Sequence, residues 1–195
     1  MITNYKGKLA RLSWNSGEQE MFGAILDHTE VFIFECRWGE WYALDHTNPP
    51  PDLTLEVSSG ETVAVVHTDL LGRRGALLLL AAPAQVRLER LDDQAWRQCD
   101  LPCKLSTMTM TPIVSDGRCV KLSPDGLLQF GAESLEPKTQ VLAEIPLSRA
   151  EHLILPGRVD AVKAVGQLNH KMLVRFGDLD RLTVGRLRSL TLSLV

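Results

Sequence analysis

Short runs of apolar and β-branched residues, separated by turn-forming residues, extend over almost the whole chain and restrict it to few folds. Two such runs lie at 61–68 and 76–82, on either side of the turn-forming segment Leu71-Gly-Arg-Arg-Gly75. Further runs lie at 8–14, 21–26, 30–36, 105–114, 118–122, 127–131, 139–145, 158–165, 171–176 and 187–195. Many short strands at this spacing are typical of barrels and sandwiches. The sequence therefore predicts an all-β protein.

One window before residue 100 has helical character. Leu91–Gln98 contains Asp92 and Asp93, and acidic residues are favourable near a helix N-terminus. The 195 residues are enough for two small domains, and the segment 91–102 is the best boundary between them. We therefore expect one domain over residues 1–90, and a second β-rich domain, a barrel or a sandwich, over residues 103–195.

Composition excludes several classes of protein. Hydrophobic residues make up 45% of the chain and charged residues 23%, which are ordinary values for a globular protein. Every window of about 20 residues contains a charge, so no transmembrane helix is expected. The N-terminus has no basic flank followed by an apolar stretch, so no signal peptide is expected. These features predict a cytoplasmic protein without a membrane partner.

The four cysteines are too few and too scattered for a disulfide framework. Cys99 and Cys103 form one closely spaced pair, and Cys119 could add a third zinc ligand. No fourth cysteine or histidine follows at a short spacing, as a structural zinc site would require. We therefore expect reduced thiols, Cys36 included, and no metal or cofactor.

Charge is distributed unevenly along the chain, whose formal net charge is −3. Residues 1–82 hold six Lys and Arg against eleven Asp and Glu, a net charge of −5. Residues 149–195 hold eight Lys and Arg against four Asp and Glu, a net charge of +4. A candidate basic strip on the expected C-terminal strands comprises Lys171, Arg175, Arg186 and Arg188. Such a strip could contact phosphates, or it could be a solvated sheet face.

Residues 5–82 contain five segments, in order, that resemble the cold-shock domain family. Glu20-Met-Phe-Gly-Ala-Ile25 is similar to its first RNA-binding motif, Lys-Gly-Phe-Gly-Phe-Ile, and Glu30-Val-Phe-Ile-Phe34 to its second, Asp-Val-Phe-Val-His-Phe. The other segments are Lys6-Gly-Lys-Leu-Ala-Arg-Leu, Leu55-Glu-Val-Ser-Ser-Gly-Glu-Thr-Val-Ala-Val65 and Arg74-Gly-Ala-Leu-Leu. The resemblance implies a five-stranded Greek-key barrel of the OB type that binds single-stranded RNA or DNA.

Alternation along the strands supports an aromatic binding face. Val31 and Ile33 suit a barrel interior, which would leave Phe32 and Phe34 facing outward, where Phe22 of the neighbouring strand could join them. Exposed rings on an OB face are a stacking platform for bases. The candidate nucleic-acid-binding residues are Lys6, Lys8, Arg11, Trp14, Phe22, Phe32, Phe34, Arg37, Trp38 and Trp41. The protein is expected to act within a larger complex.

Departures from the family pattern leave a second interpretation open. Glu20 and Glu35 border the expected platform, where they would repel phosphate. Ala24 and Phe34 replace an aromatic residue and a histidine of the two motifs. The alternative is a protein–protein interaction subunit whose aromatic face docks a partner without touching nucleic acid. Trp38 and Trp41 either extend the platform or pack on the barrel.

Catalytic patterns are weak in this sequence. The five histidines lie in different segments, and neighbouring pairs such as Asp27-His28 would face opposite sides of a strand. The chain contains no Gly-x-Ser-x-Gly, His-Glu-x-x-His, P-loop or dinucleotide fingerprint. We therefore predict a non-enzymatic protein with no catalytic residues.

Overall fold

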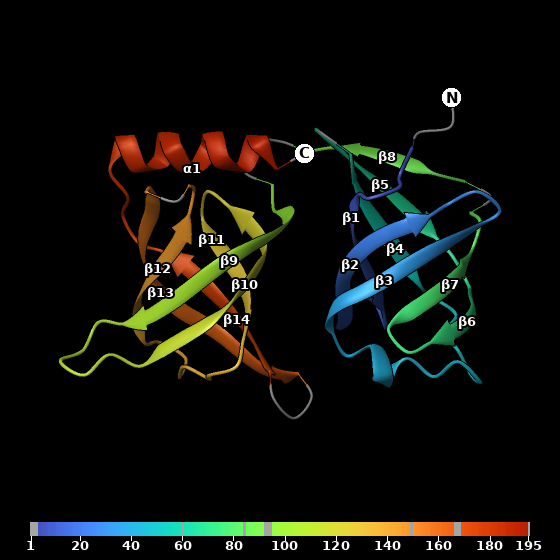
Figure 1. The fold of residues 1–195 in the computed structure, drawn as a ribbon, viewed down its shortest axis with the longest axis horizontal. Coiled ribbons are helices and arrows are strands. Elements are labelled where there is room, and N and C mark those ends of the chain that lie inside the picture. The colour runs from blue at the N-terminus through green and yellow to red at the C-terminus, as the bar shows by residue number, and fades with distance from the viewer. Residues whose placement is uncertain are drawn as a thin grey trace. The chain divides into compact units, whose positions relative to one another are not determined.

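The computed structural model describes residues 4–59, 61–83, 85–91, 95–148, 150–165 and 169–194 (Figure 1). It divides into two compact units, unit 1 up to Leu91 and unit 2 from Asp92 to Leu194. Almost every element is a strand, so the all-β class is confirmed. Among the residues that the structure describes, no helix is long and apolar enough to span a membrane.

Unit 1 is an eight-stranded antiparallel sheet in the order β6-β7-β3-β2-β1-β4-β5-β8. Its elements are β1 (Leu9–Trp14), β2 (Gln19–Asp27), β3 (Val31–Gly39), η1 (Trp41–Ala43), β4 (Thr54–Ser59), β5 (Thr62–His67), β6 (Leu70–Arg74), β7 (Leu77–Ala81) and β8 (Arg87–Arg90). The sheet thus has three strands more than the five expected, because β4, β6 and β8 also form.

The aromatic side chains of β3 point into unit 1. Phe32 and Phe34 are buried, whereas Val31 and Ile33 between them are only half-buried. The expectation that the two phenylalanines face outward is therefore wrong. Alternation fixes which residues share a face but not which face is inside, and placing the larger rings inside removes more apolar area from water.

Unit 2 is a closed barrel of six strands in the order β10-β11-β14-β13-β12-β9. The strands are β9 (Arg97–Thr107), β10 (Val114–Ser123), β11 (Gly126–Gly131), β12 (Gln140–Pro146), β13 (His152–Val165) and β14 (Asn169–Phe176). The second β-rich unit is thus confirmed as a barrel. The expected helix at 91–98 is wrong where the structure describes it, because Arg97 and Gln98 begin β9; residues 92–94 lie outside the described residues.

A helix, α1 (Arg181–Ser193), forms where the sequence predicted a strand over 187–195, so that prediction is wrong for the residues described. Asp180 caps the helix, since its Oδ1 accepts hydrogen bonds from the backbone N–H groups of Leu182 and Thr183 at 2.9 and 3.0 Å. The hydroxyl of Thr183 donates to Oδ2 at 2.6 Å. These hydrogen bonds, that of the Thr183 side chain first, lower the pKa of Asp180.

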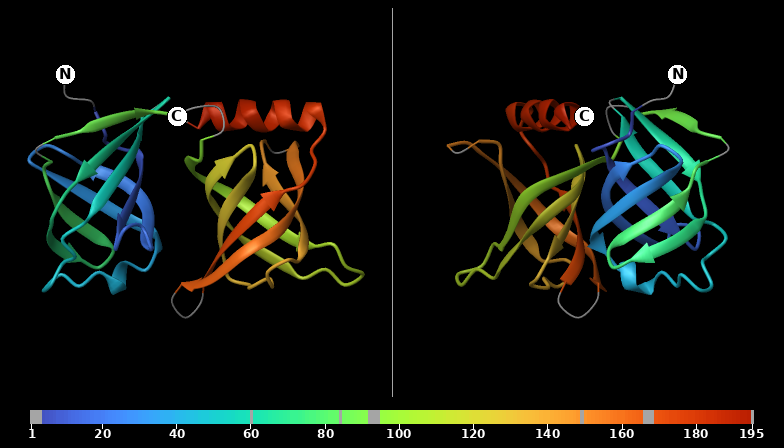
Figure 2. Two further views of the ribbon diagram at one scale, coloured as in Figure 1. Left: turned by 180° about the vertical axis from the view of Figure 1, so that it is seen from behind. Right: turned by 45° about the vertical axis from the view of Figure 1, so that its right-hand side comes forward.

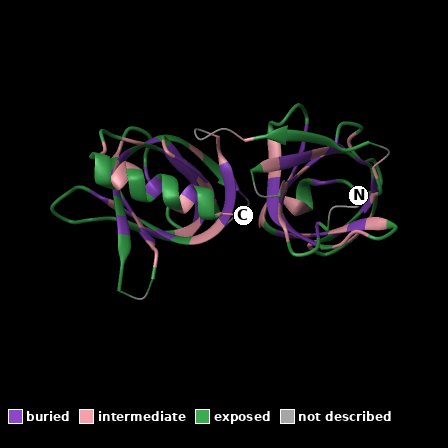
Figure 3. Ribbon diagram, turned by 90° about the horizontal axis from the view of Figure 1, so that it is seen from above, coloured by how far each residue is buried: buried purple, intermediate pink, exposed green. Residues whose placement is uncertain are grey.

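α1 lies across one open end of the unit 2 barrel (Figures 1 and 3). Leu187 and Thr191 of this helix are buried, and Leu190 and Leu194 pack against the core of the barrel. The helix contacts β10 and β13. Burial of one helix face therefore closes the barrel and leaves the other face in solvent (Figure 3).

Candidate functional site

The expected aromatic platform is buried: Phe32 and Phe34 belong to the core of unit 1, and Phe22 is buried outside that core cluster. Phe22, Phe32 and Phe34 are all buried, with exposed fractions of 4%, 4% and 0%, and Trp14 is buried with them. Phe32 lies 6.0 Å from the ring of Tyr5, measured between ring centroids, inside the sheet. A base cannot stack on a ring that protein already covers. The prediction of single-stranded RNA or DNA binding by this face is therefore wrong, whereas the alternative, a protein–protein interaction subunit, would need another surface for its partner.

Of the cationic residues expected beside the aromatic platform, the arginines form ion pairs with carboxylates and the lysines lie before β1. Arg11 is half-buried between two carboxylates, with Nε 2.6 Å from Glu20 and Nη1 2.8 Å from Glu56. Arg37 pairs with Glu35 of its own strand at 3.1 Å, and both side chains are partly exposed. Glu20 and Glu35 thus hold the arginines in ion pairs. Lys6 is exposed and Lys8 half-buried in the segment before β1.

The tryptophans after the second motif are partly buried. Trp38 belongs to β3, and Trp41 in η1 packs against the core of unit 1. The guanidinium of Arg73 lies 5.5 Å from the centre of the Trp41 ring, and its Nη1 donates to the carbonyl oxygens of Trp41 and Leu44 at 3.1 and 2.9 Å. Trp41 and Arg73 therefore hold the segment after β3 in place, which favours packing over an extended platform.

The expected basic strip is divided between a strand and the helix. Lys171 and Arg175 lie four residues apart on β14 and so share one face, whereas Arg186 and Arg188 belong to α1. Arg175 lies directly opposite Arg158 of β13. Its guanidinium lies 5.6 Å from the ring centre of Trp96 and its Nε 3.8 Å from a carboxylate oxygen of Asp160. The outer face of β13 and β14 thus carries paired arginines beside an indole ring.

The cysteines of unit 2 are buried thiols. Cys99, Cys103 and Cys119 belong to the barrel core, and the Sγ atoms of Cys99 and Cys119 are 3.5 Å apart. Burial raises the pKa of Cys103 to about 12 and that of Cys119 well above its usual value. In the described part of the chain, no three His, Cys, Asp or Glu side chains are grouped to hold a metal ion. These thiols are part of the core packing.

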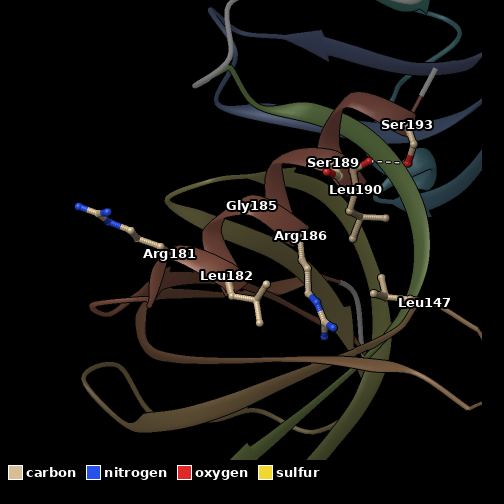
Figure 4. Close-up of a pocket in the computed structure, with 8 residues that line it drawn as sticks. All are labelled: Leu147, Arg181, Leu182, Gly185, Arg186, Ser189, Leu190 and Ser193. Atoms are coloured by element: carbon tan, nitrogen blue, oxygen red, sulfur yellow. Dashed lines mark hydrogen bonds between the residues drawn. The ribbon is translucent and has the colours of Figure 1, made fainter.

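A groove of about 590 Å³ runs along α1 on the surface of unit 2 (Figure 4). One side is the helix and the other includes Leu147, just after β12. Its lining residues are Leu147, Arg181, Leu182, Gly185, Arg186, Ser189, Leu190 and Ser193. Figure 4 shows Leu182, Arg186 and Leu190 pointing to the side on which Leu147 lies, whereas Arg181 points away. We call this the α1 groove.

The α1 groove has an apolar wall and a positive rim. Leu182 is 68% exposed although it lies in the first turn of the helix. α1 contains Arg181, Arg186 and Arg188 and no acidic residue. Arg186 lies 3.4 Å from Glu151 of the neighbouring segment, and both side chains are about half exposed. The groove therefore offers apolar surface framed by cations.

Two signals in the sequence point to this helix. Asp180 precedes Leu182-Thr183 as an N-cap would. Leu187, Leu190 and Leu194 follow at helical spacing, although every second residue from Leu190 to Leu194 is also a leucine. Since that alternation equally fits a strand, the Asp180 cap is the signal in the sequence that favours the helix over the predicted strand.

Comparisons with known proteins give solved structures only. No family model matches the sequence, and no curated protein matches it. The chain is similar to Escherichia coli YcgR in complex with c-di-GMP, with 14% identity over 96% of this chain and 84% of that one (TM-score 0.42). It is also similar to the Bacillus subtilis inhibitor of motility MotI/DgrA, with 10% identity over 99% and 97% (TM-score 0.44). A third is the K. pneumonia MrkH–c-di-GMP complex, with 9% identity over 96% and 87% (TM-score 0.46).

None of these three is a cold-shock protein. The resemblance of residues 5–82 to that family remains one of sequence, while the burial of Phe22, Phe32 and Phe34 removes the function drawn from it.

Proposed function

We propose that this chain is a non-catalytic interaction protein that binds a partner protein in the α1 groove. The observation that carries the proposal is the apolar lining of the α1 groove, where Leu182 is 68% exposed beside Leu147 and Leu190, which pack on the core of unit 2 and are only partly buried. Exposed contiguous apolar surface on a folded domain is typical of a site that another molecule covers.

The length of the groove favours an elongated occupant. Its lining runs from Arg181 to Ser193, which at 1.5 Å per residue is about 18 Å of helix. An amphipathic helix that lays its apolar face into such a groove is a recurring mode of protein recognition. At Gly185 an added Cβ would meet nothing within 4 Å, so the backbone of a partner helix has room to approach there.

Charge favours an acidic partner. Arg181 and Arg186 line the groove; Arg186 lies 3.4 Å from Glu151, and α1 itself contains no carboxylate. An acidic helix would complement these cations, whereas a second copy of α1 would bring three further arginines against them. The partner segment is therefore amphipathic, with leucine-like residues on one face and Asp or Glu beside it.

Selection from a displayed library of helical peptides on the purified full chain tests this function. Enriched peptides should be acidic and amphipathic. Replacing Leu182 with serine should weaken the binding of these peptides at least about tenfold, because the free energy of burying one leucine side chain is lost. Gly185→Leu, which adds a side chain at a position where a Cβ meets nothing within 4 Å, should have a similar effect. Fluorescence anisotropy measures both.

Leu192→Ser is the matched control, because Leu192 is exposed on the same helix but does not line the groove. It should leave peptide binding within about twofold of the wild type. Selection that enriches no helical peptide, or binding that is indifferent to Leu182 and Gly185, would refute the proposal. Binding to anionic vesicles that is lost in Leu182→Ser would instead assign the groove to a membrane surface.

The outer face of β13 and β14 supports a second candidate function, the binding of a small anionic ligand with an aromatic ring. Like charges directly opposite each other in a sheet are unfavourable, and Arg158 and Arg175 both lie near one carboxylate, that of Asp160, at 3.9 and 3.8 Å. A phosphate group would relieve that repulsion, and Trp96 could stack on a base. A cyclic dinucleotide carries both groups.

Calorimetric titration with c-di-GMP tests this second candidate. Saturable binding is expected, with Arg175→Ala weakening it at least about tenfold, since hydrogen bonds to charged groups contribute about 1.5–3 kcal/mol. Arg74→Ala, an exposed arginine of unit 1, is the control and should have no effect. Absence of heat at millimolar ligand would exclude this role, and equal loss in both variants would show unspecific charge attraction.

A further inference from the structure

The tip of the β9–β10 hairpin displays large apolar side chains to solvent. Met108, Met110 and Ile113 are 57%, 105% and 57% exposed. The hairpin extends from the unit 2 barrel (Figure 2). From Leu105 to Ser115 the chain has no charged residue. We call these three side chains the methionine knob; they are exposed within the part of unit 2 that the structure describes.

Threonines fix the conformation of this tip. The backbone N–H of Ile113 donates to Thr107 Oγ1 at 2.9 Å, and Thr109 Oγ1 donates to the Thr111 carbonyl at 2.9 Å. The N–H of Met108 donates to the carbonyl of Gln140 at 3.1 Å. The backbone that carries the knob is therefore held by hydrogen bonds, which lowers the ordering cost of its recognition by a complementary hollow.

Unit 1 has an apolar hollow of about 310 Å³ on the outer face of β3, β7 and β6. Ile33, Leu79 and Gly72 lie opposite one another across these three strands. An added Cβ at Gly72 would meet nothing within 4 Å, so the absent side chain leaves the hollow open. Leu77 and Leu79 are partly exposed beside it. We call this the leucine hollow.

We propose that the methionine knob of one copy of this chain inserts into the leucine hollow of a second copy. A cavity of about 150 Å³ holds a benzene molecule, so the hollow has room for about two side chains of this size. Each surface is apolar and each is exposed on its own unit. Burying them against each other removes both from water.

The charged residues at the base of the knob and at the rim of the leucine hollow favour a second copy of this chain as the molecule that fills the hollow. Asp116 and Lys104 lie opposite each other at the base of the knob, and both are exposed. Arg74 lies at the rim of the hollow, where Asp116 of the inserted hairpin could pair with it. Because the charges of Asp116 and Lys104 offset each other, the base of the knob does not attract an anionic membrane, which binds clusters of cations.

A contact between two different surfaces does not close on itself, so copies can add head to tail. Sedimentation velocity of the full chain should show a sedimentation coefficient that rises reversibly between about 10 and 500 μM, because a contact this small binds weakly. Met110→Ser combined with Ile113→Ser removes the knob, and Gly72→Phe fills the hollow. Each variant alone should remain a monomer.

Mixing the two variants is the decisive experiment. The knob variant keeps its hollow and the hollow variant keeps its knob, so a 1:1 mixture should form dimers and nothing larger. Ile154→Ser, which removes an isoleucine as exposed as Ile113, should associate like the wild type. Leu79→Ser is a second hollow variant, should Gly72→Phe fail to fold by circular dichroism.

A wild-type chain that stays monomeric at 500 μM would overturn the proposal, as would a mixture without dimers or an equal loss in Ile154→Ser. The α1 groove takes no part in this contact, so Leu182→Ser should not change the sedimentation coefficient.

Discussion

Replacing Phe34 with alanine is expected to lower the free energy of unfolding of unit 1 by about 3–5 kcal/mol, the usual cost of truncating a buried phenylalanine. Phe34 is fully buried in the core of the sheet. A loss of this size is a large fraction of the 5–15 kcal/mol that stabilises a typical domain. Urea unfolding followed by tryptophan fluorescence measures it, since Trp14, Trp38 and Trp41 all belong to unit 1.

The control is Leu79→Ala on the neighbouring strand β7. Leu79 points outward and is 38% exposed, so its truncation should cost less than about 1 kcal/mol. The two variants together distinguish a core ring from a surface platform. If Phe34→Ala unfolds at the same urea concentration as Leu79→Ala, Phe34 is not the core residue described here.

The strand pattern of this protein could be predicted from its sequence, because short apolar runs between turns have few other solutions. The facing of β3 could not be predicted, since Val31-Phe-Ile-Phe34 is apolar on both sides and alternation alone cannot choose between them. The choice depends on which set of side chains fills the interior, and that is settled by packing with distant strands. Because the phenylalanines of β3 face the interior, the aromatic binding face that the sequence predicted is not on the surface.

The helix shows a different limit. From Leu190 to Leu194, alternating leucines satisfy a strand as well as a helix, so periodicity alone is ambiguous. Asp180 resolves it locally by capping the first turn, and the open end of the barrel resolves it globally by burying Leu187. The α1 groove follows from that helix, and Arg186, chosen as part of a sheet face, lines the groove from the helix instead.

Two glycine-to-alanine substitutions in unit 2 should have opposite effects. At Gly117 of β10 an added Cβ would lie 2.1 Å from the carbonyl oxygen of Phe130 and 2.8 Å from Cα of Gly131. Both atoms belong to the backbone of β11, so relief requires the two strands to separate. We expect Gly117→Ala to cost about 3 kcal/mol or more, at or above the upper end for overpacked cores.

Gly185→Ala is the counterpart, since the added methyl group meets nothing within 4 Å in the middle of α1. Alanine restricts the unfolded chain and favours the helix, so this variant should be more stable by about 0.5–1 kcal/mol. Urea unfolding followed by circular dichroism of the full chain measures both variants. Because the chemical change is the same, a difference in sign isolates the close approach of β10 and β11 as the cause. Equal stability of Gly117→Ala and the wild type would mean that the two strands do not approach this closely, and the barrel would then be open between them.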